Sequence, residues 1–306
     1  MRHNDYSSRI PEQIFVYDEY HRPDESTLPD PQVNPVLIGA RVPIQKVGIA
    51  PVDLPIKVWR REGGQQELQA QASLYCSLDD PNIKGLNLSR LYLVMHETIK
   101  DHLSLDGIMA ALKHMAYKQR SHNAYCKLRF KYPWTQKSLR SNLEGHIAYN
   151  VELEGQYYND TFRFYLTVDY IYSSTCPCSY ELAHQATSTR GVAANAHSQR
   201  SIAKVKIRFD RQNIVWIEDI VELCREVIPP EVQVVVKRID EQAFSELNGA
   251  NLLFSEDAAR LLYGALDTWY EIGKIFDFSI VIEHYESLHP WSAICVIHKG
   301  IQNGLR

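Results

Sequence analysis

The sequence contains no long hydrophobic segment and no excess of basic residues. No apolar run approaches the roughly 20 residues that a membrane-spanning helix needs, and residues 1–15 lack the apolar core of a secretion signal. The 33 basic and 37 acidic residues give a net charge of −4, so no overall positive field attracts nucleic acid or an anionic membrane. We therefore expect a cytoplasmic protein that binds neither nucleic acid nor membrane.

Cysteine is also sparse, with six residues distributed over 306 positions. A small secreted domain stabilised by disulfides would be shorter and richer in cysteine. One pair is nevertheless close, because Cys176 and Cys178 flank a proline in the segment STCPCS. In a reducing compartment, such a pair is more typical of a metal site or of catalysis than of a disulfide. We expect these two thiols not to form a disulfide with each other.

Hydrophobic periodicity predicts an α+β protein. Residues 1–40 are polar and rich in proline and aspartate, which indicates a flexible N-terminal arm. Alternating segments predict strands at 54–60, 67–78, 124–132, 145–155, 161–174, 201–210, 232–238, 278–285 and 292–300. Helical spacing or helix boundary signals predict helices at 101–119, 213–228 and 255–273. The order of strands and helices indicates two modules, at 41–156 and 157–306.

Four connections in the second half each offer a metal-binding group. Cys176 follows the clearest predicted strand, His197 precedes the next one, Glu241 follows the short strand at 232–238, and His289 lies between the last two strands. If these connections meet at one end of the sheet, their thiolate, imidazole and carboxylate groups form a mixed site suited to Zn²⁺, Fe²⁺ or Mn²⁺. Taken alone, each histidine also fits a surface or hydrogen-bonded role.

One predicted strand carries three cations on a single face, since Lys204, Lys206 and Arg208 alternate with apolar residues. This ladder is either a solvated face of the sheet or a wall that binds phosphate.

Six short segments also carry a family resemblance. KGLNLSR, STCPCS, HSQRS, KRIDE, FSEDAAR and ESLH occur in this order between residues 46 and 295, and the chain resembles the GTP cyclohydrolase I type B family. The resemblance implies two tandem T-fold modules, whose antiparallel sheets carry helices on one face, the second module holding most of the metal site. It also implies a homotetramer with active sites between subunits, one divalent metal per subunit and no organic cofactor.

The same resemblance implies a reaction and a set of site residues. GTP would be hydrolysed to 7,8-dihydroneopterin triphosphate and formate, the first step of tetrahydrofolate and pterin biosynthesis. A metal lowers the pKa of bound water from 15.7 toward about 7, which supplies hydroxide for attack on the purine. Matching positions assign the metal to Cys176, His197, Glu241 and His289, with Cys176 also counted as catalytic.

The base and the triphosphate need further contacts. Glu256, in FSEDAAR, matches the glutamate that anchors the purine, since one carboxylate accepts both N1–H and the 2-amino group of guanine. The candidate contacts to the triphosphate are Arg200, Ser201, Lys204 and Lys206. Because metal-bound histidines are not free acids, a separate proton carrier is required, for which Cys178 and His184 are candidates.

The sequence departs from the family pattern at three places. The segment between Cys178 and His197 is longer than usual, Asn87 stands where the first-half motif carries a histidine, and Trp291 stands two residues after His289.

Two other functions remain as alternatives. A T-fold nitrile reductase acting on a deazaguanine would use a free cysteine nucleophile, and a non-catalytic module would use the metal for stability. The additional histidines disfavour the reductase. The ligand gaps of 21, 44 and 48 residues disfavour a closed structural zinc site.

Overall fold

Eight strands form one continuous antiparallel sheet in which the spatial order follows the order in the sequence. A computed structural model describes residues 24–28 and 38–300, so most of the predicted N-terminal arm lies outside the described residues. The strands are β1 (Ile44–Trp59), β2 (Gln65–Leu78), β3 (Ala124–Lys137), β4 (Glu144–Tyr158), β5 (Thr161–Thr175), β6 (Ser198–Phe209), β7 (Asp277–His284) and β8 (Ala293–His298).

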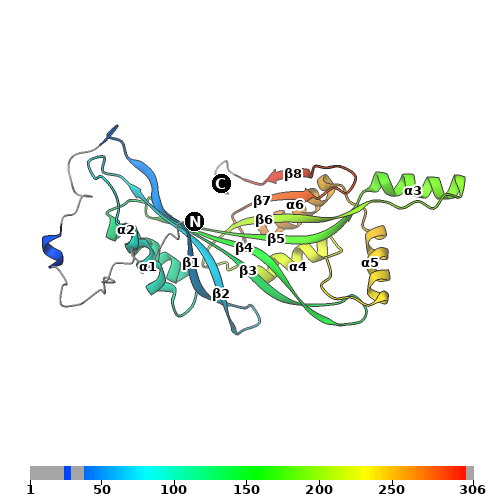
Figure 1. Cartoon of the computed structure of the whole chain (residues 1–306), viewed down its shortest axis with the longest axis horizontal. Helices are drawn as coiled ribbons and strands as arrows, with labels where there is room; N and C mark the ends of the chain where they lie inside the picture. The colour runs from blue at the N-terminus through cyan, green and yellow to red at the C-terminus, as the bar shows by residue number, and fades with distance from the viewer. Residues whose placement is uncertain (1–23, 29–37, 301–306) are drawn as a thin grey trace, which may run out of the picture.

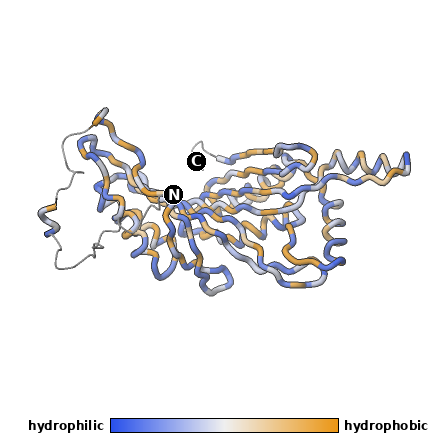
Figure 2. Tube along the Cα trace, viewed as in Figure 1, coloured by the Kyte–Doolittle hydropathy of each residue, from blue (hydrophilic) through white to orange (hydrophobic). Residues whose placement is uncertain are grey.

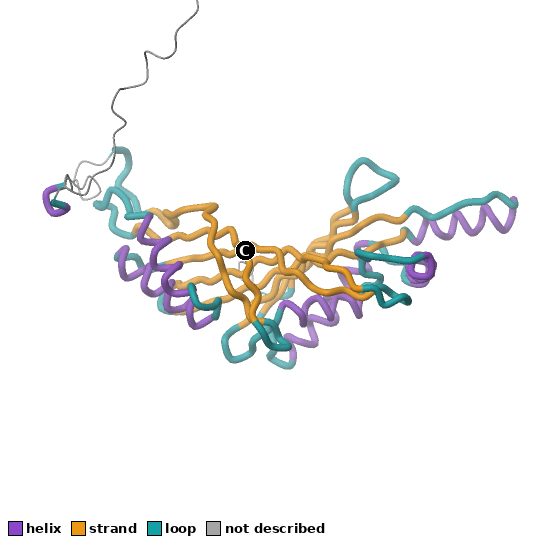
Figure 3. Tube along the Cα trace, turned by 60° about the horizontal axis from the view of Figure 1, so that its bottom comes forward, coloured by secondary structure: helices purple, strands orange, loops and turns teal. Residues whose placement is uncertain are grey.

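Helices connect pairs of strands, and α1, α2, α4 and α6 cover one face of this sheet (Figures 1 and 3). They are α1 (Ser89–Ile99), α2 (Leu105–Gln119), α3 (Pro177–Arg190), α4 (Ile217–Val227), α5 (Arg238–Ala250) and α6 (Ser255–Glu271), besides a short 3₁₀ helix, η3 (Glu25–Thr27). Helices α1 and α2 pack on the first four strands, and α4 and α6 pack on the last four. Among the described residues, no helix combines the length and apolar composition that crossing a membrane requires.

The core lies between the sheet and these helices. Along the central strands, hydrophobic residues alternate with hydrophilic ones (Figure 2), so one side of each strand faces the helices. In β6, Ala203, Val205 and Ile207 are fully buried. Helix α2 approaches β4 so closely that a Cβ atom on Gly155 would lie 2.7 Å from Cγ2 of Ile108. Glycine is therefore required at this contact.

The two halves of the sheet have the same order of two strands, helices and two strands. This confirms the predicted α+β architecture of two tandem modules. The halves are joined by a tight turn at Asn159 and Asp160, both of which have positive φ, and β4 pairs with β5 across it. The sheet is therefore continuous through this junction, and the division after residue 156 stays a prediction.

The predicted strand at 232–238 is wrong. This segment forms no named strand, and its nearest sheet contact is an isolated bridge between Glu231 and Tyr172. The side chain of Gln136 instead bonds to the carbonyl of Val232 (2.8 Å) and accepts from the amide of Val234 (3.0 Å). β5 pairs with β4 only as far as Asp169, so its edge beyond that residue is free, but the chain follows this edge only from Pro230 to Val232. The Gln136 side chain then binds the Val232 carbonyl and the Val234 amide, which a strand would need for pairing.

Three helices were not predicted. Helix α3 extends away from the body of the molecule (Figure 1) and buries Ala186 alone, so it has no apolar face that periodicity detects. Helices α1 and α5 likewise lie in segments for which no helix was predicted.

Candidate active site

Cys176 and His197 lie next to each other where β5 and β6 meet. Thr175 pairs with Ser198 in the antiparallel sheet, so the chain leaves β5 at Cys176, passes through α3 and returns at His197. The amide of Cys176 donates to the carbonyl of His197 (3.2 Å), and the amide of His197 donates to Oγ of Ser179 in the first turn of α3 (3.1 Å). Two candidate ligands separated by 21 positions in the sequence are therefore neighbours.

The imidazole ring of His197 is held by a short polar network. Its Nδ1 lies 3.0 Å from Oε1 of Gln199 and 3.8 Å from Oε2 of Glu286. Gln199 donates from Nε2 to Oγ of Ser174 (2.8 Å), which in turn bonds to Oγ of Ser201 (2.8 Å). Because a carboxylate and an amide carbonyl are both acceptors, they favour the tautomer with hydrogen on Nδ1. The Nε2 lone pair of His197 then remains available for a ligand.

Gln199 and Glu286 were not among the predicted site residues. Both belong to segments that the sequence singled out, HSQRS and ESLH, so the signal was present. Ser201, predicted to contact substrate, is fully buried and supports the network around His197.

Glu241 and His289 do not join Cys176 and His197 in this chain. Glu241 is exposed in the first turn of α5, not after a strand as expected. His289 is exposed and its ring stacks on Trp291, with ring centroids 4.1 Å apart. Within the described part of the chain, no group of three or more His, Cys, Asp or Glu side chains is arranged to hold a metal ion. The described chain thus assembles half of the predicted ligand set.

Glu256 lies exposed at the N-terminus of α6, which packs on β7 and β8. Its own backbone N–H and the Ser255 hydroxyl, which donates to Oε2 at 3.0 Å, lower the pKa of Glu256. The carboxylate is therefore ionised at neutral pH and has acceptor capacity left for two parallel donors.

His284 is a buried histidine beside Glu256 that sequence reasoning missed. It ends β7, is 3% exposed, and its Nε2 lies 2.8 Å from the hydroxyl of Tyr172. Burial lowers the pKa of His284 to about 4, opposed in part by the negative charge of Glu256. The alternation of β7 could have indicated it, since Phe278, Ile280 and Ile282 continue to His284 at a buried position.

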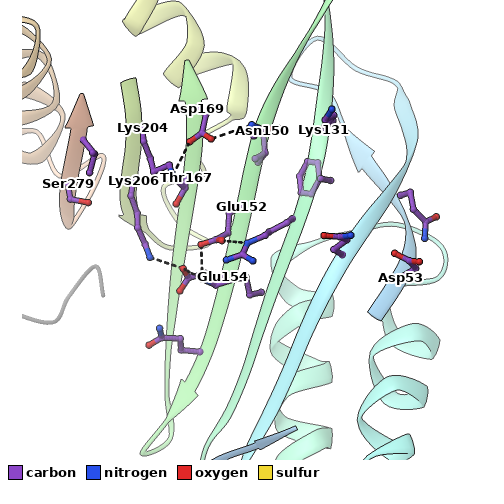
Figure 4. A pocket seen from close by; sticks show the side chains of 18 of the residues that line it. Asp53, Lys131, Asn150, Glu152, Glu154, Thr167, Asp169, Lys204, Lys206 and Ser279 are labelled. Carbon is purple, nitrogen blue, oxygen red and sulfur yellow. Dashed lines mark hydrogen bonds and ion pairs between the residues drawn. The ribbon is translucent and has the colours of Figure 1, made fainter. Parts of the chain in front are cut away.

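The predicted phosphate contacts lie in two places. Arg200 is exposed three positions after His197, and because it alternates with the buried Gln199 and Ser201, its side chain lies on the other face of β6. Lys204 and Lys206 lie further along β6, in an open hollow of about 940 Å³ on the helix-free face of the sheet (Figure 4). Their ammonium groups are 3.9 Å from Asp169 and 2.7 Å from Glu154. Because Lys206 is nine residues beyond His197, the two are roughly 30 Å apart along the strand.

The fold defines the class of this protein as a T-fold protein with a candidate active site at the ends of β5, β6 and β7. Uricase from Arthrobacter globiformis is a structural neighbour with a TM-score of 0.50 and 8% sequence identity, covering 88% of this chain and 96% of that one. At this identity the likeness concerns the fold alone, and it agrees with the predicted T-fold.

Sequence comparison identifies the family. A model described as type I GTP cyclohydrolase folE2 matches residues 28–295. GTP cyclohydrolase FolE2 of Dinoroseobacter shibae is 41% identical over 306 residues, covering 97% of this chain and 81% of its own. The FolE2 protein of Roseobacter denitrificans is 39% identical over 297 residues, covering 96% and 79%. The chain belongs to the type I GTP cyclohydrolase folE2 family, which confirms the resemblance found in the sequence.

Proposed function

We propose that this protein is a GTP cyclohydrolase that converts GTP to 7,8-dihydroneopterin triphosphate and formate. Membership of the family supports the activity. The structural observation that carries the proposal is a chain of contacts from the Cys176–His197 pair to His284, on the strand against which α6 packs with Glu256 in its first turn. It runs through Gln199, Ser174 and Ser201, then through the pairing of Ser201 with His284, whose charge environment includes Glu256.

Glu256 is proposed to bind the guanine base. Its carboxylate is exposed and ionised, and guanine presents N1–H and the 2-amino group as two parallel donors. Of the four predicted phosphate contacts, Arg200 is the exposed cation nearest to His197 along the chain, which supports the role, and it lies on the other face of β6 from Gln199 and Ser201. Lys204 and Lys206 already face carboxylates, so for them the role requires that these ion pairs open.

The proposal includes one divalent metal ion, Zn²⁺, Mn²⁺ or Fe²⁺, held by Cys176 and His197. A thiolate beside an imidazole with a free Nε2 is a donor pair that these ions accept. Glu241 and His289, as they stand in the described chain, do not fit as the remaining ligands. Metal analysis of Glu241→Ala and His289→Ala variants measures their contribution.

We also propose that the active assembly is a homotetramer with sites between subunits. The support from this chain is its open sheet, which ends in edge strand β8. Ile294 and Val296 of that strand are 62% and 53% exposed, and an exposed apolar edge strand favours association with another chain.

The function is tested by GTP turnover of the wild type and of Glu256→Gln. The substitution replaces an acceptor oxygen with a donor that faces a donor of guanine, so kcat/KM for GTP should fall at least roughly 10-fold. Bound metal, measured on the same samples, should stay unchanged. No dihydroneopterin triphosphate from the wild-type protein would reject the function, and equal kcat/KM values would return Glu256 to a role in stabilising the start of α6.

A further inference from the structure

A single polar ring interrupts the buried face of β7. Phe278, Ile280 and Ile282 are fully buried on the side that α6 covers, and His284 follows them on the same side. Glu256, in the first turn of α6, is the charged group that acts on this imidazole, and His284 in turn helps to lower the pKa of Glu256. Helix α6 packs on β7 and ends shortly before β7 begins at Asp277, so it runs back along the strand and its first turn, with Glu256, lies toward the end of β7 that His284 occupies.

The contact with Tyr172 fixes the hydrogen of the imidazole. Tyr172 is fully buried, and burial raises the pKa of its hydroxyl, so the hydroxyl keeps its proton. Within the described part of the chain, Nε2 of His284 is the one hydrogen-bond partner of that hydroxyl. Since a buried O–H without an acceptor is costly, Tyr172 donates to Nε2, and the hydrogen of the neutral ring lies on Nδ1.

The Nδ1–H group of His284 is a free donor in this chain. No described residue accepts a hydrogen bond from it. Nδ1 is also not among the side-chain nitrogen and oxygen atoms of the described residues that are fully buried without a hydrogen-bond partner. The ring is 3% exposed, so a single edge reaches the surface. Such an edge is suited to one directed hydrogen bond and offers no face for stacking.

We propose that Nδ1–H of His284 donates to the C6 carbonyl oxygen of the purine whose N1–H and 2-amino groups are accepted by Glu256. The inference rests on the proposed function. Guanine presents an acceptor followed by two donors along this edge, and His284 with Glu256 presents a donor followed by two acceptors. Adenine, with a 6-amino donor and an acceptor at N1, mismatches both residues, so the pair selects 6-oxopurine nucleotides.

The test compares GTP with 6-thioguanosine triphosphate at neutral pH. The two nucleotides share N1–H and the 2-amino group, but sulfur is a weaker acceptor than oxygen. For the wild type, kcat/KM should be roughly ten-fold higher with GTP than with 6-thioguanosine triphosphate. His284→Phe keeps a ring of similar size and removes the donor, so this preference should disappear. Glu256→Gln should lower kcat/KM for both nucleotides and leave their ratio unchanged.

Two further variants separate recognition from folding. Tyr172→Phe keeps the imidazole but releases its tautomer, so it should reduce the preference without abolishing it. His114→Phe, at an exposed position of α2, is the matched control and should behave as wild type. Melting temperatures of all variants show which ones fold. If His284→Phe does not fold, the preference of Tyr172→Phe for GTP tests the hydrogen bond instead.

The outcomes distinguish the two proposals. A wild type without GTP turnover rejects the function and this inference together. An active wild type whose preference is unchanged in folded His284→Phe, or unreduced in Tyr172→Phe, overturns the inference alone and makes His284 a packing residue.

Discussion

Lowering the pH should destabilise the fold through His284. Burial lowers the pKa of this side chain to about 4, against an ordinary value of 6.5. The folded state thus binds the proton less tightly than the unfolded chain. The contribution of the neutral ring is fully present above pH 6.5 and is lost as the pH falls from 6.5 toward 4. The linkage relation gives a loss of about 2 kcal/mol between pH 7.5 and 5, and about 3 kcal/mol in full.

The neighbours of His284 set the direction of this effect. Tyr172 on β5 donates a hydrogen bond to the ring and stays neutral, and Glu256 on α6 is the nearby carboxylate that favours protonation. Cys295 on β8, whose pKa burial raises, is also neutral in this range. Desolvation is the dominant cause, so the one carboxylate reduces the shift without reversing it.

Urea unfolding at fixed protein concentration measures this contribution. Wild type, His284→Phe and the exposed control His114→Phe are compared at pH 7.5 and 5. Carboxylates elsewhere titrate alike in all three proteins, so the difference between variants isolates the ring. Wild type and His114→Phe should lose about 2 kcal/mol more than His284→Phe on acidification. Equal losses in all three proteins would refute the assignment of His284 as a buried, neutral imidazole.

Three other predictions follow from contacts in the chain. Gly155→Ala should lower the free energy of unfolding by about 1–3 kcal/mol because the new Cβ meets α2, whereas Gly264→Ala, with open space in α6, should raise it by up to about 1 kcal/mol; urea unfolding measures both. Arg61→Ala, which removes the ion pairs between the β1–β2 turn and α4, should cost about 1 kcal/mol at low salt and less at high salt in the same assay. Cys176→Ser should lose bound divalent metal while Cys178→Ser, at an exposed position, keeps it, as measured by elemental analysis; equal retention would remove Cys176 from the metal site.

Much of the sheet was predictable because, along each central strand, apolar residues that face the core alternate with polar residues that face solvent. β6 is the clear case, with buried Ala203, Val205 and Ile207 between exposed or half-exposed cations. The segment at 232–238 has an equally strand-like composition, but strand propensity carries no information on which partner its backbone finds, and the Gln136 side chain binds Val232 and Val234. Helix α3 was missed for the opposite reason, since a helix that buries one residue has no periodicity to detect.

The site was predictable to the extent that sheet pairing determines it. Cys176 and His197 flank two strands that pair in antiparallel fashion, so their proximity follows once β5 and β6 are recognised. The placement of Glu241 depended on the strand that does not exist, and the residue instead begins α5. His289 lies in a connection whose conformation no local pattern determines. The proximity of Cys176 and His197 therefore follows from regular backbone, whereas the positions of Glu241 and His289 do not, and the assignment of all four as metal ligands stays a prediction.

The site begins where the core ends, along one face of three adjacent strands. Successive rows across β5, β6 and β7 are Val168–Val205–Ile280, Tyr170–Ala203–Ile282 and Tyr172–Ser201–His284. The next positions outward are Ser174 and Gln199, and then Cys176 and His197.

This gradient from apolar to polar explains how a rigid sheet orients reactive groups. The polar side chains hold one another from the core outward, as Ser174 is held by Ser201 of the next row in, and Gln199 by Ser174 of its own row. The orientation of His197 thus depends on a hydroxyl that is fully buried and has no access to substrate. Because β5, β6 and β7 also carry the core, the same packing that stabilises the fold determines the direction in which His197 and His284 present their nitrogen atoms.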